Sequence, residues 1–568
     1  MELAKMIKVA RGEEEADLLL KNAKVVSVFS GDIHETNVAI SHSRIVGLGD
    51  YRAKKGMDLK GLYLCPGFID GHVHIESSMV TVPEFARAVV PQGTTSVVID
   101  PHEIANVLGL DGIRYMLESS KYNPLSVYFM LPSCVPSTHM ETAGAELLWY
   151  DLAMLLEGEW VLGLGEVMNY PGVLLCDPTV LDKIRAAKGK RIDGHAPGLS
   201  GRDLVAYIAA GVRSDHECTT IEEAREKLRL GMYIMIREGT TTRNLEDLLP
   251  LVTPENSRRC MFVTDDRHPA ELMDEGHINS MIKKAISLGL KPITAIQMAT
   301  LNPAEYFGLD DKGAVSPGYR ADLVVFDNFE DFNIKMVFRN GQIVAEEGEM
   351  LPLEVKPKKV PIRGSMNVNW EGVDFKVPAK GTRARVINIV PGQIFTTQLI
   401  EEVRVNDGLA VADVERDILK IAVIERHLAS GNVGVGFIKG LELKKGAIAS
   451  SVSHDSHNIV VAGTNDEDML TAAVEVVSMG GGLVAAVGGR ILARLPLPIA
   501  GLMSDKPLSE VRAQMDKLLA TTSEMGSSLH DPFMVLSFMA LAVIPELKLT
   551  DKGLVDVTQF KLVPLFVD

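Results

Sequence analysis

The fold is decided by the stretch Cys65-Pro66-Gly67-Phe68-Ile69-Asp70-Gly71-His72-Val73-His74. It begins with a Pro-Gly turn signal, continues through the short apolar run Phe68-Ile69, and ends in two histidines separated by one residue. On an extended strand, residues two apart point to the same face. We therefore expect His72 and His74 to project together, as ligands of one metal ion must. A His-x-His pair alone is weak evidence, so the interpretation depends on ligand-type residues at later strand ends.

Length and composition limit the class of protein. A chain of 568 residues is too long for one core, and two to four domains are expected. The net charge of −17 argues against nucleic acid or an anionic membrane as the main partner. The five cysteines are dispersed without a CxxC pair, which is typical of reduced thiols. No secretory signal or long apolar run is visible, so we expect a cytoplasmic protein with no membrane contact.

Residues downstream of this stretch alternate between strand-like runs and helical patterns, which is typical of a parallel α/β fold. With Phe68-Ile69 first, eight strand candidates occur, and residues 66–310 match the usual size of a (β/α)8 barrel. The other seven are Thr95–Ile99, Ser126–Met130, Val161–Gly165, Arg191–Gly194, Gly211–Ser214, Tyr233–Ile236 and Met261–Thr264.

Both flanks of the barrel carry short alternating strands. Residues 1–65 and 311–355 contain such runs, and Asn340-Gly341 is a strong hairpin signal. We infer one small β-sandwich domain built from both flanks. A linker marked by Pro352, Pro357 and Pro361, with Lys356, Lys358 and Lys359, is expected to lead into a C-terminal α+β domain over residues 356–568.

Metal-ligand residue types stand at the C-terminal ends of five of the predicted strands. They are His72 and His74, Glu166, His195, His216 and Asp265. Their separations fit barrel units of roughly 30 residues each, and strand ends on this face are where barrel enzymes place their chemistry. Six ligand positions exceed the four of one tetrahedral ion. Two ions, with Glu166 able to bridge them, are the economical interpretation.

Several segments resemble the adenine deaminases of the amidohydrolase superfamily, and the likeness extends over essentially the whole chain. These segments are residues 67–78 (GFIDGHVHIESS), 100–106 (DPHEIAN), 165–173 (GEVMNYPGV), 194–197 (GHAP), 214–217 (SDHE) and 264–269 (TDDRHP). Many amidohydrolases use a carbamylated lysine where Glu166 stands, and the resemblance implies that adenine deaminases share this departure.

The resemblance implies deamination of adenine to hypoxanthine and ammonia by a metal-bridging hydroxide, as in purine salvage. It assigns His72, His74 and Asp265 to one ion, His195 and His216 to the other, and Glu166 to both. It favours Mn(II) or Fe(II), with zinc as the alternative. Asp265 would accept and return the proton. Glu103, His102 and Asp266 are candidates for protonating a ring nitrogen and binding the purine edge. We also expect a homo-oligomer.

One polar cluster in the C-terminal region stands out, Ser453-His454-Asp455-Ser456-His457-Asn458. Enzymes commonly close an open barrel mouth with an additional segment. We hypothesise that this cluster lies over the mouth and that His454 and His457 contact the substrate. The alternative at this point is an exposed loop remote from the site.

Two other functions remain open from the sequence. A cyclic-amide hydrolase, such as a dihydroorotase or hydantoinase, uses the same barrel, although the absence of the strand-4 lysine counts against it. A catalytically inactive scaffold is the other alternative, although such proteins lose ligands and here every expected position is filled.

Overall fold

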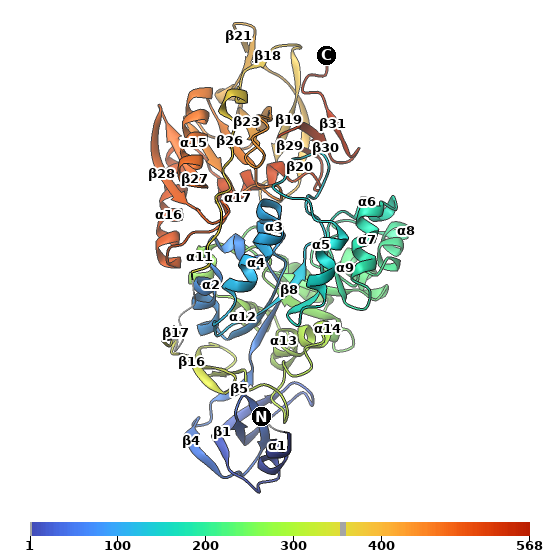
Figure 1. Cartoon of the computed structure of the whole chain (residues 1–568), viewed down its shortest axis with the longest axis vertical. Helices are drawn as coiled ribbons and strands as arrows, with labels where there is room; N and C mark the ends of the chain where they lie inside the picture. The colour runs from blue at the N-terminus through green and yellow to red at the C-terminus, as the bar shows by residue number, and fades with distance from the viewer. Residues whose placement is uncertain (1–2, 353–358) are drawn as a thin grey trace.

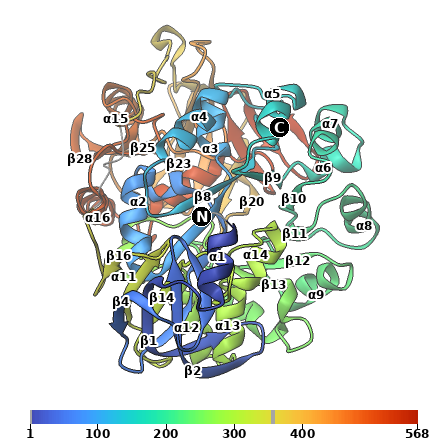
Figure 2. The same cartoon turned by 60° about the horizontal axis from the view of Figure 1, so that its bottom comes forward.

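The computed structural model describes residues 3–352 and 359–568. These residues form three parts. Figure 1 shows a small β domain with the N-terminus at the bottom, an α/β barrel in the middle and the C-terminal domain at the top. Figure 2 brings the small β domain forward, with the barrel strands behind it. The expected linker residues Lys356, Pro357 and Lys358, and the predicted boundary at 355/356, lie outside the described residues.

The middle part is a closed barrel of eight parallel strands, which confirms the predicted (β/α)8 fold. Hydrogen bonds join β6 to β10 in one run and β11 to β13 in another. The strands are β6 (Phe68–Val73), β7 (Thr94–Ile99), β8 (Ser126–Leu131), β9 (Val161–Val167), β10 (Arg191–Gly194), β11 (Ser214–Asp215), β12 (Tyr233–Arg237) and β13 (Cys260–Val263).

Closure occurs beside the opening sequence stretch. The Asp265 N–H donates to the His72 carbonyl at 3.0 Å, and the His74 N–H donates to the Asp265 carbonyl at 3.1 Å. These bonds join the ends of β6 and β13, the first and last strands of the barrel. The residues predicted to bind one metal therefore lie on neighbouring backbone segments.

Strand sequence explains strand burial. β7 reads TTSVVI and is buried at every position. A β-branched run without polar alternation is typical of a parallel strand that is covered on both faces. The sixth strand begins at Ser214, later than the predicted Gly211. Gly211 has φ +118°, a conformation that suits a turn after a helix and not an extended strand.

Helices surround the barrel, those up to α10 between these strands and α11 to α14 after β13. They are α2 (Val82–Val89), α3 (His102–Leu108), α4 (Leu110–Ser119), α5 (Trp149–Leu156), α6 (Tyr170–Leu174), α7 (Pro178–Ala186), α8 (Gly201–Ala209), α9 (Ile221–Arg229), α10 (Leu245–Leu248), α11 (Pro269–Asp274), α12 (Ile278–Ser287), α13 (Pro292–Met298) and α14 (Leu301–Phe307).

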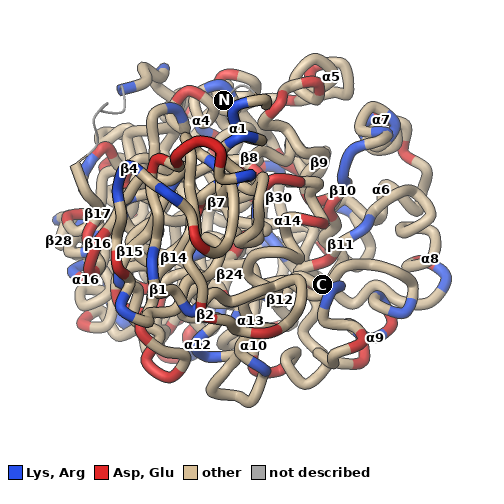
Figure 3. Tube along the Cα trace, turned by 90° about the horizontal axis from the view of Figure 1, so that it is seen from below, with Lys and Arg blue, Asp and Glu red and all other residues tan. Residues whose placement is uncertain are grey.

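The small β domain is assembled from both flanks, and α1 (Leu3–Ala10) precedes it. Its strands are β1 (Ala16–Ser27), β2 (Asp32–Ser41), β3 (Arg44–Leu48), β4 (Ala53–Asp58), β5 (Tyr63–Pro66), β14 (Leu323–Phe326), β15 (Ile334–Arg339), β16 (Gln342–Glu346) and β17 (Glu349–Met350). All nine connect into one sheet, in which β5 pairs with both β1 and β14. The small β domain is thus one continuous sheet, whose buried residues form separate core clusters. Figure 3 shows acidic and basic residues interspersed over this end of the molecule.

The C-terminal domain mixes strands and helices, as predicted. Its main sheet has eight strands in the order β20-β19-β24-β23-β26-β25-β27-β28. These are β19 (Arg383–Ile389), β20 (Thr396–Glu402), β23 (Ile418–Ile424), β24 (Val433–Lys439), β25 (Ala447–Ser450), β26 (Ile459–Gly463), β27 (Gly482–Val487) and β28 (Arg490–Pro496). The helices are α15 (Asp466–Ser478), α16 (Leu508–Glu524) and α17 (Pro532–Ser537). Two three-stranded sheets complete it: β18 (Val377–Pro378), β21 (Arg404–Asn406) and β22 (Leu409–Val411), then β29 (Leu547–Thr550), β30 (Gly553–Asp556) and β31 (Lys561–Val563).

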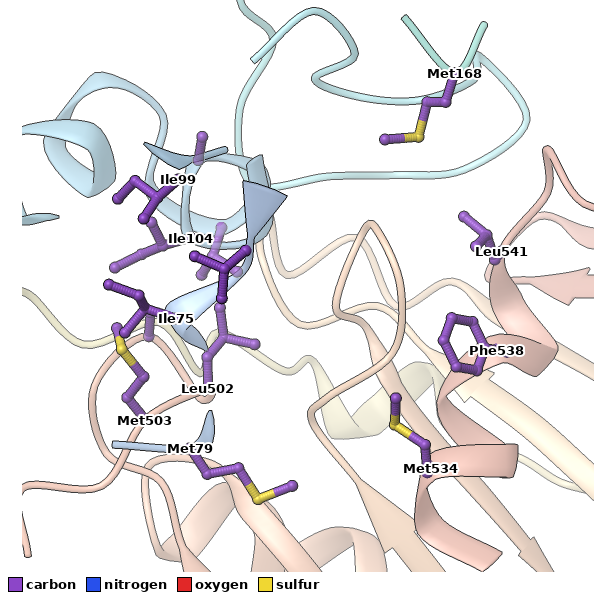
Figure 4. Packing of buried hydrophobic residues seen from close by; sticks show 14 of the residues in the cluster. Ile75, Met79, Ile99, Ile104, Met168, Leu502, Met503, Met534, Phe538 and Leu541 are labelled. Atoms are coloured by element: carbon purple, nitrogen blue, oxygen red, sulfur yellow. The ribbon is translucent and has the colours of Figure 1, made fainter. Parts of the chain in front are cut away.

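The C-terminal domain packs on the barrel mouth through a shared apolar core. Figure 4 shows Ile75 and Ile104 of the barrel beside Leu502 and Met503 of the C-terminal domain, and all four belong to one buried cluster. The Ser504 N–H also donates to the Met79 carbonyl at 2.8 Å. Across residues 3–352 and 359–568, we find no helix that combines the length and the apolar character needed to cross a membrane.

Candidate active site

A cavity lies where the barrel mouth meets the C-terminal domain. Its lining divides into ligand-type residues, further polar residues and apolar residues. The lining consists of His74, His102, Glu103, Glu166, Met168, His195, His216, Glu217, Arg237, Thr242, Asp265, Asp266, Ile394, His454, Asp455, Phe538, Leu541 and Ile544. Both domains therefore contribute to one site.

The six predicted metal ligands come together at the C-terminal ends of the strands. His72 and Glu166 lie within the last residues of β6 and β9, His74, His195 and His216 directly follow β6, β10 and β11, and Asp265 lies two residues after β13. All six are buried, with His195 the most exposed at 8%. Glu166 stands between two pairs of imidazoles. Its Oε1 lies 3.8 and 3.2 Å from Nε2 of His72 and His74.

The other oxygen of Glu166 faces the remaining histidines. Oε2 lies 2.7 Å from His195 Nδ1 and 3.2 Å from His216 Nε2. Asp265 Oδ1 lies 3.5 and 3.2 Å from Nε2 of His72 and His74. One carboxylate thus reaches both histidine pairs, which is the arrangement a bridging ligand requires.

These side chains fit a divalent metal centre. Ligands at bonds of about 2.1 Å and tetrahedral angles stand about 3.4 Å apart, close to most of the separations above. The His74 Nδ1–H donates to the Asp100 carbonyl at 2.9 Å, which leaves the Nε2 lone pair directed at the carboxylates. His72 Nε2 is buried without a hydrogen-bond partner among the described residues. Coordination to a metal ion would satisfy such a nitrogen.

Local charge keeps the acidic ligands ionised. Burial opposes the charged form of Glu166, but the imidazoles of His216 and His195 hold the pKa of Glu166 well below its usual range. Burial likewise opposes ionisation of Asp265, and its contacts with His72 and His74 hold the pKa of that carboxyl low. Both carboxylates can therefore bind cations at neutral pH.

The loops that carry His195 and His216 are fixed by a buried lysine. Helix α9 begins at a capping threonine, whose hydroxyl accepts from the Glu223 N–H at 3.3 Å. The helix directs Lys227 inward, where Nζ donates to the Ala196 carbonyl at 2.7 Å and to Asp215 at 3.0 Å. These acceptors are immediate neighbours of the two histidines, so the lysine orients both ligand loops.

An ion pair at the site was not predicted from the sequence. Arg237, the last residue of β12, donates from Nη2 to Glu217 Oε2 at 3.1 Å and from Nη1 to Asp265 Oδ2 at 2.8 Å. Its Nη1 also contacts Glu217 Oε1. Arg237 directly follows the predicted strand Tyr233–Ile236, so its strand-end position was a signal, but its cationic side chain is not a metal-ligand type. Arg237 holds Oδ2 of Asp265 and leaves Oδ1 facing the histidines.

The Ser453–Asn458 cluster lies at the site. His454 Nδ1–H donates to Glu103 Oε1 at 2.5 Å, and His457 Nε2–H donates to Glu103 Oε2. The Ser453 N–H donates to His457 Nδ1 at 3.1 Å, so His457 is neutral with its proton on Nε2. Burial disfavours both cations, yet Glu103 raises the pKa of His454 to about 9, whereas burial lowers the pKa of His457 to about 4. Because Nε2 of His457 carries a proton, it has no lone pair for a metal ion. Glu103, His454 and His457 therefore form a hydrogen-bonded set and not a third metal site.

Three more polar residues border this set. His102 Nε2 lies 3.4 Å from Glu103 Oε1 and 3.8 Å from Asp455 Oδ1. Asp266 accepts a hydrogen bond from the Ser77 hydroxyl. All three face the same cavity as the metal ligands.

The C-terminal domain supplies most of the apolar surface of the cavity. Phe538, Leu541, Ile544 and Ile394 come from it, and Met168 from the barrel. Figure 4 shows Phe538 and Leu541 on one segment across from Met168. The Phe538 ring stacks on His454 at 4.6 Å between centroids. Buried Lys548 donates to the Ile394 carbonyl at 2.9 Å and to the Phe538 carbonyl at 3.0 Å, which joins two parts of this surface.

An outer groove adjoins the cavity. It has a volume of about 830 Å³ and lies between the loops after β11 and β12 and residues 392–397 of the C-terminal domain. Glu217, Arg237 and Thr242 line both the groove and the cavity. The groove is therefore continuous with the cavity that holds the predicted metal ligands.

The parallel barrel, with a cluster of His, Glu and Asp side chains suited to a divalent metal centre at its strand ends, defines a hydrolase of the amidohydrolase superfamily. The model of the Amidohydrolase family matches residues 63–344, and that of the Adenine deaminase C-terminal domain matches residues 393–561. The chain belongs to the adenine deaminase family.

Full-length relatives carry the same name. The chain is 54% identical over 563 residues to an adenine deaminase of Desulfatibacillum aliphaticivorans, with 99% of each chain covered. It is 54% identical over 562 residues to adenine deaminase 2 of Carboxydothermus hydrogenoformans, again with 99% of each covered. Identity to an adenine deaminase of Kosmotoga olearia is 49% over 575 residues, covering 100% of this chain and 99% of the other. This membership decides against the cyclic-amide hydrolase and the inactive scaffold.

Proposed function

We propose that the protein hydrolyses adenine to hypoxanthine and ammonia, using two divalent ions held by His72, His74, Glu166, His195, His216 and Asp265. The observation that carries the proposal is the placement of Glu166, whose two oxygens face separate histidine pairs. Family membership supports adenine as the substrate.

The ligand set contains nitrogen and oxygen atoms and no sulfur. Such a set suits manganese, iron or zinc, and we propose Mn(II) or Fe(II) for this family member. When bound, the ions would supply a water activated for attack at neutral pH. Glu166 would contact both ions, with His72, His74 and Asp265 on one side and His195 and His216 on the other.

Asp265 is proposed to move the proton. Its Oδ1 faces the metal ligands, where it can accept the proton of the attacking water and return it to the departing amine. Arg237 fixes the rotation of this carboxylate through Oδ2. Because Asp265 is held in this position, its carboxylate can accept and return the proton without a movement of the backbone.

Glu103 and its neighbours are proposed to act on the purine ring. Protonation of a ring nitrogen makes C6 a better electron acceptor, and Glu103 accepts hydrogen bonds from His454 and His457, which orient it for this role. His102 lies between Glu103 and the metal ligands, where it can assist the protonation of the ring nitrogen. Asp266 and the two C-terminal histidines would bind the polar edge of the base. The apolar surface around Phe538 suits the flat face of a purine.

A substrate panel tests this function. Metal-loaded protein is incubated with adenine, adenosine, cytosine, dihydroorotate and hydantoin, while ammonia release and product absorbance are followed. We expect one hypoxanthine and one ammonia per adenine, near two ions per chain, and poor turnover of adenosine because the ribose would clash in an enclosed site. Ring opening of a cyclic amide without turnover of adenine would overturn the proposal.

A further inference from the structure

Asp455 occupies an unusual position in the cavity. It is a carboxyl group of the C-terminal domain, 2% exposed, on the loop between β25 and β26. Neither of its oxygens accepts a hydrogen bond from the residues that the structure describes, and Oδ2 is completely buried in that state. An ionised carboxyl normally accepts several hydrogen bonds, and leaving it unpaired is costly.

The other acidic residues of the cavity already have partners. Glu103 is bonded through both oxygens to His454 and His457, and Glu217 through both oxygens to Arg237. Asp266 accepts from Ser77. Glu166 and Asp265 belong to the metal ligands. Asp455 is therefore the carboxyl group of the cavity that accepts no hydrogen bond through either oxygen among the described residues, so both oxygens are left for a bound molecule.

The position of Asp455 relative to the metal ligands fits one end of a purine. The His102 ring lies between Glu166 and Asp455. Its Nδ1 is 3.6 Å from Glu166 Oε1, and its Nε2 is 3.8 Å from Asp455 Oδ1. A purine whose C6 amino group lies at the metal ligands would extend past His102 toward Asp455. Its five-membered ring would then lie nearest this carboxyl group.

We propose that Asp455 accepts the N–H of the five-membered ring of adenine and thereby selects the free base over 9-substituted adenines. The inference rests on the proposed function. Free adenine carries one N–H on this ring, and a substituent at N9 removes it. An analogue without the N–H would leave a buried carboxylate unpaired, which is the arrangement that gives discrimination of about 10⁴–10⁵ in other enzymes. Burial raises the pKa of Asp455 to about 6, so the acceptor form prevails at pH 7.5.

The test compares adenine with 9-methyladenine, whose substituent is much smaller than ribose. The proteins are the metal-loaded wild type, Asp455→Asn, Asp455→Ala and, as a matched control, Asp516→Asn at the exposed end of an ion pair on α16. Measured quantities are kcat/KM for each base, competitive inhibition constants, metal content and Tm. The control is expected to match the wild type.

We expect kcat/KM for adenine to fall about 100-fold or more in Asp455→Asn, with 9-methyladenine changed less than about threefold. Asp455→Ala should improve 9-methyladenine, because its methyl group gains space. An equal loss on both bases, or unchanged adenine kinetics, would overturn the inference. If Asp455→Ala does not fold, the ratio of kcat/KM for adenine to kcat/KM for 9-methyladenine in Asp455→Asn decides. Failure of the wild type to deaminate adenine would instead reject the proposed function.

Discussion

His454 donates a hydrogen bond to Glu103 at 2.5 Å, although the two residues are 351 positions apart in the chain. Glu103 lies in the first turn of α3, and His454 lies on a loop of the C-terminal domain. The bond is buried on both sides, since Glu103 is 2% and His454 4% exposed. The carboxyl group proposed to act on the purine is therefore oriented by the other domain.

This relationship predicts the outcome of a double-mutant cycle. His454→Ala and Glu103→Gln should each lower kcat/KM for adenine about 100-fold or more, because each removes one half of a proton-delivering pair. The double variant should be little worse than either single variant. Metal content should stay near the wild-type value, and His530→Ala, an exposed histidine, is the control. Independent, multiplying losses would show that the two residues act separately.

Asp265→Asn should abolish most turnover while retaining metal. The amide keeps an oxygen for weak coordination but cannot accept and return a proton, a function worth roughly 10²–10⁴ in rate. Steady-state kinetics together with metal analysis check this. Near-normal kcat with both ions bound would mean that another residue carries the proton.

Glu166→Gln should reduce the number of bound ions. A neutral amide is a poor bridge between two dications, and each oxygen of Glu166 serves a different histidine pair. Metal analysis after dialysis should give fewer than two ions per chain, with activity lost in parallel. Full occupancy of both sites would exclude Glu166 as the bridge.

Lys548 predicts a pH-dependent stability. Burial lowers the pKa of Lys548 to about 7, against 10.5 in the unfolded chain. At pH values between these two pKa values, Lys548 is protonated in the unfolded chain and mostly neutral in the folded protein. The free energy of unfolding of the wild type therefore increases as pH rises from 7 toward 10, by at most about 1.4 kcal/mol per pH unit. Lys548→Met lacks this contribution.

Calorimetry of both proteins at several pH values tests the prediction. The Tm of the wild type minus that of Lys548→Met should increase steadily from pH 7 to pH 10. Lys445→Met, which changes an exposed lysine, should run parallel to the wild type. A constant difference between the wild type and Lys548→Met would show that the buried amine keeps an ordinary pKa.

The barrel could be predicted because its signals are local. Apolar runs such as Thr95–Ile99 are followed by polar residues at regular spacing, and this pattern fixes both the strands and the face on which ligands gather. His195 and His216 were identified in this way. The pairing of Glu103 with His454 has no local signal, because it depends on how two domains pack.

Other parts of the site escaped prediction for related reasons. Phe538 and Leu541 lie in an apolar segment that reads the same whether it lines a cavity or fills a core. Arg237 was missed because the site residues were predicted as metal ligands, and a cationic side chain is not one. Strand β11 is only two residues long, because Gly211 and its left-handed backbone conformation delay its start.

The division of the cavity between two domains affects how the protein is made. Translation has delivered the proposed metal ligands once it reaches Asp265, but the partners of Glu103 appear only with His454 and His457, and the apolar surface is complete only with Ile544. The barrel sequence therefore carries all six proposed metal ligands but only part of the surface that would enclose a base. Any stop codon before Ile544 removes part of the cavity. Deaminase activity thus depends on residues of the C-terminal domain as well as on those of the barrel.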